Sequence, residues 1–473
     1  MKNIKDIEIK KENYPVKVIQ FGEGNFLRAF IEWQIQQMNN KGLFKGSVAV
    51  VQPIERGMID CLEEQNNNYT VVLEGLLEGK KIQSDEIISV INCTVNPYKD
   101  FEDYLKLADI ESVEFIFSNT TEAGITYDDN DKLEDKPAKT YPAKLTQLLH
   151  RRFKNGMFGF QIIPCELIEH NGVNLKKIVL QYAQLWNLGE EFVAWINAEN
   201  NFYSTLVDRI VPGFPHDNKE EVFARIGYED NMLVKAEAFL LFVIEGNKKL
   251  EELLPLKKAG LNVIVTDDMQ PYRERKVRLL NGPHTTMTPL ALLAGVETVG
   301  NVMKDDDFLQ FINDEMYDEI SPMIALPKDE LTMYIEAIKE RFNNPFVRHE
   351  LTSIALNSIS KCEYRLLPTI IQNIERTGKV PKRITLAFAA WLYIYGPYGQ
   401  MTVEPQDTPE VMAALKEMEN SDDFVKSVLG HEDFWGVDLT KYPELVAQVK
   451  KNIDDIQEVG TRALVKKLTK VNN

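Results

Sequence analysis

The 473-residue sequence has few cysteines, few histidines and no long apolar run. The four cysteines are scattered and form no Cys-x-x-Cys pair, which fits a reducing cytoplasm better than a disulfide framework. The six histidines form no His-x3-His pair, so we expect no catalytic metal. The longest apolar runs, residues 238–244 and 386–395, are far shorter than the roughly 20 residues of a membrane-spanning helix. The charged N-terminal stretch lacks an apolar core and is not expected to be a signal peptide.

Basic residues are fewer than acidic ones. The 54 Lys and Arg residues face 72 Asp and Glu residues, which gives a formal net charge of −18. Nucleic acids and anionic membranes bind basic surfaces, so neither is an expected partner, although an anionic small molecule could bind a local cluster of Lys and Arg. The length exceeds the roughly 250–300 residues at which a single core stops growing, so two domains are expected.

A strand, a glycine turn and a helix follow one another near the N-terminus. Residues 16–20 predict a buried strand, and a helical pattern runs from the turn to about residue 38. This arrangement can bind a pyrophosphate at the helix N-terminus. The third glycine of the dinucleotide motif is replaced by Leu27, so an ordinary strand–turn–helix remains the alternative. The candidate cofactor-binding residues in the turn are Gly22, Gly24, Asn25 and Phe26.

Two further strands continue the nucleotide-binding pattern. Residues 46–52 end in Gln52, where an acidic residue would bind the adenosine ribose. Arg56 is near enough to accept a 2′-phosphate, so spacing alone leaves NAD and NADP open. Residues 113–118 precede the segment Asn-Thr-Thr-Glu-Ala-Gly, whose Thr121 and Glu122 are predicted to line the cofactor crevice, with an ordinary turn as the alternative.

The character of the sequence changes near residue 268. Further strands are predicted at residues 159–164, 240–244 and 261–265, whereas the remaining sequence contains amphipathic segments and no convincing strand. We therefore expect an α/β Rossmann-like domain over residues 1–268, followed by a mainly α-helical substrate and catalytic domain over residues 269–473.

The segment KVRLLNGPH places an ammonium, an amide and an imidazole within nine residues. On an ideal helix Asn281 lies roughly 140°, and His284 roughly 80°, from Lys276, so all three share one broad face. Pro283 lacks an N–H and clashes with the carbonyl four residues earlier, which predicts a kink or a helix restart. The alternative is a surface turn with a solvated lysine.

These groups suit hydride transfer with a side chain that handles the proton. A ketone under reduction needs a proton donor and a neutral amide that stabilises its oxygen. Lys276 can donate the proton if burial or the nearby Arg273 and Arg275 lower its pKa from about 10.4. Asn281 supplies the amide, and His284 can bind the substrate oxygen or orient the lysine.

Several motifs together resemble the polyol-specific long-chain (mannitol) dehydrogenase/reductase family along essentially the whole chain. They are FGEGNFLRAF, NTTEAG, LVDRIVP and KVRLLNGPH. The resemblance implies an NAD-dependent oxidoreductase in which Lys276 is the general acid/base and Asn281 and His284 support the substrate oxygen. It also implies that Asp208 and Lys361 bind substrate. Arg365, one helical turn after Lys361, is a candidate replacement for a family arginine that this sequence lacks, and the pair suits a sugar-acid carboxylate. The alternative is that both are solvated charges on a helix.

The segments YPAKLTQLL and IIPCELI favour a branch of the family that acts on a hexuronate, a sugar acid. The implied reaction is the reversible reduction of D-tagaturonate to D-altronate, with fructuronate or mannitol as alternative substrates and a non-enzymatic nucleotide sensor as a further alternative. Two departures from mannitol dehydrogenases stand out, because Glu166-Leu167 replaces an Asp-Asn pair and Ser353 replaces an arginine. We expect a cytoplasmic monomer or weak homo-oligomer.

Overall fold

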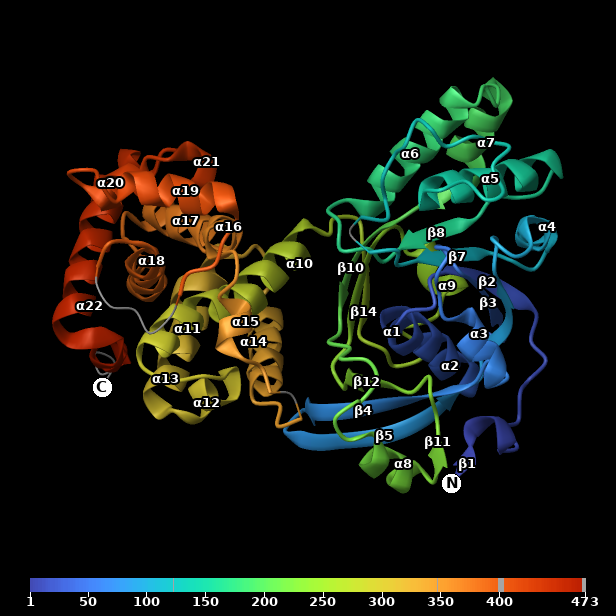
Figure 1. The fold of residues 1–473 in the computed structure, drawn as a ribbon, viewed down its shortest axis with the longest axis horizontal. Coiled ribbons are helices and arrows are strands. Elements are labelled where there is room, and N and C mark those ends of the chain that lie inside the picture. Colours follow the sequence, from blue (N-terminus) through green and yellow to red (C-terminus); the bar gives the residue numbers. More distant parts are fainter. Residues whose placement is uncertain (122, 347, 399–403, 470–473) are drawn as a thin grey trace. The chain divides into compact units, whose positions relative to one another are not determined.

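The computed structural model describes residues 1–121, 123–346, 348–398 and 404–469 (Figure 1). The chain divides into two compact units. The first comprises Met1–Gly75 and Lys81–Met269, and the second comprises Leu76–Lys80 and Gln270–Asn473. Nearly all of the strand residues lie in the first unit, and the second is mainly helical, so the expected fold class is confirmed.

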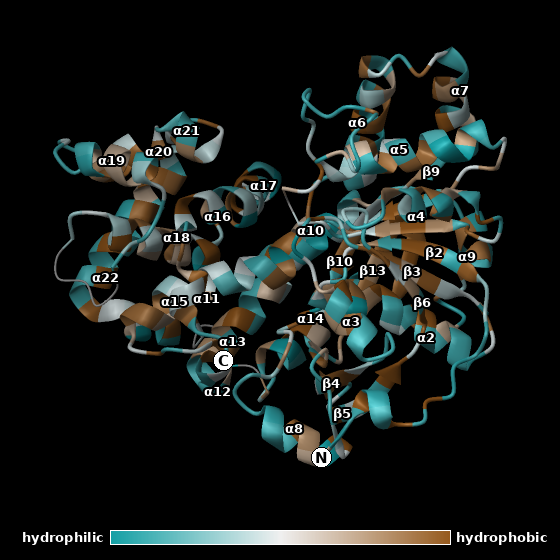
Figure 2. Ribbon diagram, turned by 45° about the vertical axis from the view of Figure 1, so that its right-hand side comes forward, coloured by the Kyte–Doolittle hydropathy of each residue, from teal (hydrophilic) through white to brown (hydrophobic). Residues whose placement is uncertain are grey.

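A six-stranded parallel sheet forms the centre of the first unit, with strand order β6-β3-β2-β7-β8-β9. Its inner strands are nearly continuous runs of apolar residues because helices cover both faces. Figure 2 shows these strands in the brown of hydrophobic residues. The strands are β2 (Val16–Phe21), β3 (Ser47–Val51), β6 (Ile91–Val95), β7 (Phe115–Ser118), β8 (Gln161–Pro164) and β9 (Asn201–Phe202).

Neighbouring residues of the central strands belong to different cores. Ile19 packs with the helices α5 (Tyr141–Lys154), α6 (Asn171–Leu185) and α7 (Glu190–Glu199). Val18 packs on the other face with the helical run α1 (Asn25–Leu27), η2 (Arg28–Glu32) and α2 (Trp33–Asn40). The alternation follows from the two-residue period of a strand.

The strand order reverses between β2 and β7. From β2 the chain proceeds to β3 and β6 on one side, and β7, β8 and β9 lie on the other. Such a switch point leaves a crevice at the carboxyl ends of the strands, where ligands of this fold class bind. Gly22 follows β2 and Asn119 follows β7, so the two segments with predicted cofactor residues meet at this crevice.

Two three-stranded sheets complete most of the first unit. One has the order β10-β13-β14 and includes both late strands that the sequence predicted. The other has the order β12-β4-β5, and its long β4–β5 hairpin was not predicted. Their bounds are β10 (Ser204–Asp208), β13 (Leu241–Glu245), β14 (Val263–Thr266), β12 (Val234–Glu237), β4 (Tyr69–Leu77) and β5 (Lys80–Ile88).

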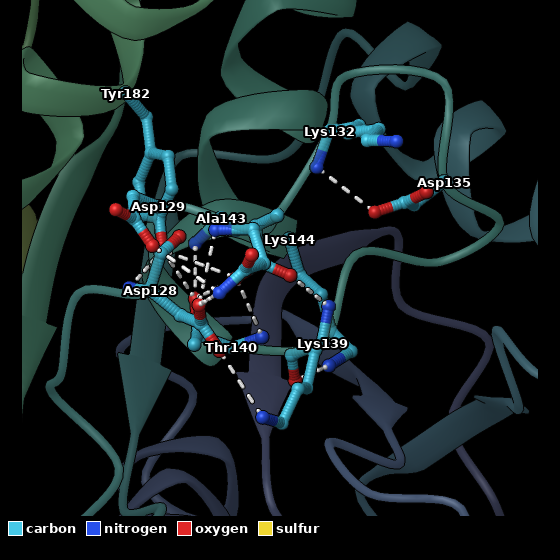
Figure 3. Close-up of polar contacts among 11 residues, drawn as sticks. Asp128, Asp129, Lys132, Asp135, Lys139, Thr140, Ala143, Lys144 and Tyr182 are labelled. Carbon is cyan, nitrogen blue, oxygen red and sulfur yellow. Dashed lines mark hydrogen bonds and ion pairs between the residues drawn. The ribbon is translucent and has the colours of Figure 1, made fainter.

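The acidic loop before α5, residues 128–139, is held by hydrogen bonds (Figure 3). Asp131 accepts hydrogen bonds from the Thr140 hydroxyl at 2.7 Å and the Tyr182 hydroxyl at 3.0 Å. The buried Lys144 ammonium donates to the Lys139 carbonyl at 2.6 Å, and burial lowers the pKa of Lys144 to about 8. Thr140 also caps α5, so these contacts fix the start of a helix that covers the central sheet.

The second unit packs helices around α11 (Gly282–Leu293) and α18 (Lys382–Tyr395). Within the part of the chain that the structure describes, no helix is long and apolar enough to span a bilayer. Other helices of this unit include α10 (Gln270–Arg275), α12 (Val299–Lys304), α13 (Asp306–Asp314), α14 (Lys328–Phe342), α15 (Leu351–Ile354), α16 (Ser358–Arg365), α17 (Leu367–Thr377) and α22 (Pro443–Thr469).

In the described part of this unit, two stretches are π-helical: η4 (Lys276–Asn281) and η5 (Glu315–Ile320). The α-helical pattern restarts at Gly282, but the helical backbone is not interrupted, because Asn281 and Gly282 both keep helical φ and ψ angles. A π turn has i→i+5 hydrogen bonds and is wider than an α turn. Leu279 lies in this wider turn, which therefore relieves the clash expected between its carbonyl and the Pro283 ring.

Candidate functional site

The glycine turn after β2 is open on the side where a ligand would approach. Gly22 has φ +113°, and a Cβ there would lie 3.0 Å from the Asn119 carbonyl oxygen, so glycine is required. A Cβ on Gly24 would meet no atom within 4 Å. Gly24 is also the N-cap of α1 and offers no capping side chain, so the helix N-terminus can receive an anion.

The other two predicted residues of the turn have contacts within the first unit. The Asn25 side-chain oxygen accepts a hydrogen bond from the Arg28 guanidinium at 2.7 Å. The Phe26 ring stacks on Phe30 with the ring centroids 4.8 Å apart. Both side chains therefore hold the turn against the helix that follows it.

A buried network of hydrogen bonds, which the sequence analysis did not predict, holds this turn in place. The Gln20 amide donates to the Gly22 carbonyl at 2.8 Å and to Glu32 at 2.6 Å. Glu32 also accepts a hydrogen bond from the Tyr69 hydroxyl at 2.5 Å, and Arg28 donates to the Glu23 carbonyl at 3.1 Å. The only signal in the sequence was a pair of charged residues four apart, Arg28 and Glu32, within the otherwise apolar stretch 26–33.

The loop after β3 is organised by Gln52, the residue at the position expected for a ribose-binding acid. The Gln52 amide is buried and donates to the carbonyls of Ile54 at 2.9 Å and Glu55 at 3.1 Å. Gln52 thus shapes the loop, whereas Glu55 and Arg56 are exposed on it.

The segment after β7 is tied to the end of β8. The Asn119 amide donates to the Cys165 carbonyl at 2.8 Å. Thr121 has φ +70°, a strained conformation for a β-branched residue and one that recurs at ligand sites. Glu122 lies outside the described residues. Leu167, which follows Glu166, is apolar and 61% exposed, so its side chain offers no amide donor to a substrate oxygen.

Asp208 ends β10 and is buried. The adjacent Arg209 donates to the carbonyls of Glu237 at 3.0 Å and Ala29 at 2.8 Å, and its guanidinium lies over the Trp33 ring. Burial lowers the pKa of Arg209 to about 9. Arg209 therefore has a structural role that joins β10 to the helix after the glycine turn.

In the second unit, the π segment η4 determines how Lys276, Asn281 and His284 are spaced around their helix. Lys276 and Asn281 are five residues apart, which matches one π turn, and Asn281 and His284 are three apart, which is close to one α turn. The change of period brings the amide closer to the lysine than the 140° of an ideal α-helix. All three side chains are half-buried.

His284 lies among aromatic and cationic side chains. Its ring centroid is 4.4 Å from Phe342 and 4.9 Å from His349. Burial, followed by the charges of His349, Arg341 and Arg365, holds the pKa of His284 well below its usual value, so the imidazole is neutral. Its Nε2 is buried and has no hydrogen-bond partner among the described residues, which leaves it available to a substrate oxygen.

The two predicted cations of α16 have different surroundings. The Arg365 guanidinium donates to the Thr285 hydroxyl at 3.1 Å, next to His284. The Lys361 ammonium instead donates to the Ile354 carbonyl at 2.7 Å and to the Leu356 carbonyl. The structure therefore brings Arg365 close to the imidazole and places Lys361 against backbone carbonyls at the C-terminal end of α15.

Three neighbours of His284 were absent from the sequence prediction: Arg341, Phe342 and His349. They lie about 60 residues further along the chain, and no motif marks them. Among the described residues, no group of three or more His, Cys, Asp or Glu side chains could hold a metal ion.

Residues 16–258 match the family model described as the mannitol dehydrogenase Rossmann domain, and residues 268–457 match the mannitol dehydrogenase C-terminal domain. An altronate oxidoreductase of Bacteroides thetaiotaomicron is 46% identical to the chain, covering 98% of this chain and 99% of that protein. One from Phocaeicola vulgatus is 44% identical with the same coverage.

Two solved structures share the fold. A substrate-free D-sorbitol dehydrogenase has a TM-score of 0.81 at 22% identity and covers 95% of both chains. A ternary complex of Pseudomonas fluorescens mannitol 2-dehydrogenase with NAD and D-mannitol has a TM-score of 0.70 at 24% identity, covering 97% of this chain and 95% of that one.

Proposed function

The chain belongs to the mannitol dehydrogenase family, and we propose that it uses NAD to interconvert D-tagaturonate and D-altronate. Membership makes it an oxidoreductase that acts on a CH–OH group. The relatives named altronate oxidoreductase match along nearly the whole chain and support this substrate over other sugars. The observation that carries the proposal is Arg365 beside His284, because a sugar acid needs a cation for its carboxylate.

The residues of the first unit fit a dinucleotide. The open space above Gly24 admits a pyrophosphate, and the positive φ of Gly22 lets the backbone turn beneath it. Thr121 and Glu122 remain proposed cofactor-binding residues. When bound, NAD supplies or accepts the hydride at the carbinol carbon.

The residues of the second unit handle the proton and the substrate oxygen. Lys276 donates a proton to the oxygen during reduction and removes it during oxidation. Asn281 donates a hydrogen bond to the same oxygen as negative charge develops there. In its neutral form His284 binds the substrate through Nε2, which has no hydrogen-bond partner among the described residues.

Arg365 is proposed to bind the carboxylate of the sugar acid. Its guanidinium is half-buried, where a charge-assisted hydrogen bond is stronger than on the surface. Lys361 already donates to two carbonyls, so we assign it mainly to holding the segment after α15, with one remaining N–H for the substrate. Asp208, cytoplasmic location and a monomeric or weakly oligomeric state remain predictions.

The test of the mechanism is Lys276→Ala. We expect the rate of NADH oxidation with D-tagaturonate to fall by roughly 10²–10⁴-fold, the usual contribution of a general acid. NADH binding, followed by fluorescence, should survive. Lys304→Ala is the matched control because Lys304 is exposed at the end of α12. Normal turnover of the Lys276 variant would contradict the assignment.

The test of the substrate compares D-tagaturonate, D-fructuronate and D-fructose in the same assay, with NADPH beside NADH. Preference for D-tagaturonate with NADH supports the proposal. Turnover of only D-fructuronate or D-fructose would replace the substrate and keep the mechanism. Preference for NADPH would instead point to Arg56 on the loop after β3.

A further inference from the structure

Glu166 is a buried carboxylate between two strand-end loops, and the chemistry proposed above gives it no role. It follows Cys165 at the end of β8 and is 2% exposed. One carboxylate oxygen accepts hydrogen bonds from the Thr120 backbone N–H and the Thr120 hydroxyl, each at 3.0 Å. The other accepts one from the Ser118 hydroxyl at 3.1 Å. All three partners are donors, which suits the ionised, acceptor-only form of the side chain.

Among the described residues, the hydrogen-bond partners of this carboxylate are hydroxyl and backbone N–H groups, and none of the main influences on its pKa is a lysine or arginine charge. Cys165 and Tyr141 interact with it electrostatically, and burial raises the pKa of both well above the usual values, so both stay neutral. Burial also raises the pKa of Glu166, and the hydrogen bonds from Thr120 and Ser118 oppose this shift. When ionised, the carboxylate is a negative charge that the hydrogen bonds from Thr120 and Ser118 stabilise.

The position of the charge relative to the crevice follows from the sheet. Ser118 ends β7 and Cys165 follows β8, on the opposite side of the switch point from β3 and β6. In this fold a dinucleotide spans the switch point with one nucleotide half on each side, and the adenosine ribose lies near the end of the second strand, here β3. The nicotinamide half then lies on the side of β7 and β8, where Glu166 is.

We propose that Glu166 is a positioning residue of the cofactor crevice, and that its charge favours the oxidised cofactor over the reduced one. This inference rests on the proposed NAD-dependent function. The pyrophosphate carries the same charge in both forms, whereas the nicotinamide ring is cationic only in NAD⁺. A nearby buried carboxylate attracts the cationic ring and has little effect on the neutral ring of NADH. The hydrogen bonds to Ser118 and Thr120 are a separate contribution that supports both forms equally.

The experiment separates the charge from the hydrogen bonds. Glu166→Gln keeps the shape, because the amide oxygen can accept from Thr120 while the NH₂ donates to the Ser118 hydroxyl. Glu166→Asp keeps the charge but shortens the side chain and loses contacts. Glu169→Gln is the matched control, since Glu169 belongs to the same loop with a side chain 62% exposed. The dissociation constants of NADH and NAD⁺ are measured on each full-length variant by fluorescence titration and competition.

We expect Glu166→Gln to raise the ratio of the NAD⁺ to the NADH dissociation constant by roughly ten- to twentyfold. A unit charge about 10 Å away has an effect of this order at an effective dielectric constant near 20. Glu166→Asp should weaken both forms while the ratio stays at the wild-type value, and Glu169→Gln should change neither.

An unchanged ratio in Glu166→Gln would overturn the inference and leave a purely structural role. A ratio that shifts equally in the Asp variant would overturn it too, because the charge is retained there. Failure of the wild-type protein to bind either form would instead contradict the proposed function itself.

Discussion

Glu315 should make the stability of the helical unit depend on pH in an unusual direction. It is fully buried in η5, and one carboxyl oxygen accepts a hydrogen bond from the Thr286 hydroxyl at 2.7 Å. The other oxygen has no partner among the described residues. Burial, followed by the nearby charge of Glu319, raises the pKa of Glu315 from 4.5 to about 8, although Thr286 and Arg383 oppose the shift.

The sign follows from proton binding. The folded carboxyl holds its proton up to about pH 8, whereas the unfolded one releases it near pH 4.5. Between these values the folded state binds more protons, so the free energy of unfolding falls as pH rises. At 1.36 kcal/mol per pKa unit, this group alone lowers it by about 4 kcal/mol between pH 5 and pH 9.

Urea denaturation of the wild type and of Glu315→Gln at pH 5, 7 and 9 measures this effect. The amide cannot ionise, so the variant should match the wild type at pH 5 and exceed it at pH 9 by up to about 4 kcal/mol. Glu336→Gln is the control, because Glu336 is largely exposed and hydrogen bonds lower its pKa despite some burial. Equal pH profiles for the wild type and Glu315→Gln would refute the reasoning.

Two further outcomes are expected. Arg365→Gln should lower kcat/KM for D-tagaturonate by roughly 10–100-fold and leave D-fructose turnover unchanged, since only the sugar acid has a carboxylate. Equal losses with both substrates would refute carboxylate binding. Arg376→Gln is the control, because Arg376 is exposed on α17. Gly22→Ala should cost about 1–3 kcal/mol of unfolding free energy because φ is +113° and the Asn119 carbonyl is close. Gly24→Ala should leave stability unchanged and weaken NADH binding; normal binding would show that the pyrophosphate lies elsewhere.

The sequence predicted the parts of the molecule whose determinants are local. The glycine turn between β2 and α1 was recognised because a strand, two glycines and a helix follow within about 25 residues. The late strands β13 and β14 were recognised because they are short apolar runs. The helical character after residue 269 was recognised because periodicity extends over many turns.

The parts that were not predicted depend on distant partners. Phe342 and His349 contact His284 only after α14 has packed near α11, and nothing in their own surroundings marks them. Glu166 appeared only as a departure from a family pattern, whereas its partners Ser118 and Thr120 lie more than 40 residues away. The π segment η4 was not predicted, because Pro283 was expected to cause a kink or a helix restart and not a wider turn before it.

The segment η4 sets a limit on transplanting this chemistry into another scaffold. A designer who copied Lys276, Asn281 and His284 at the same spacing onto an uninterrupted α-helix would rotate the amide roughly 140° from the lysine. The copied segment would match the sequence motif while its amide pointed away from the substrate oxygen. A faithful transfer has to carry the extra width of the π turn and the Gly-Pro pair after it, since the backbone irregularity is part of what the motif encodes.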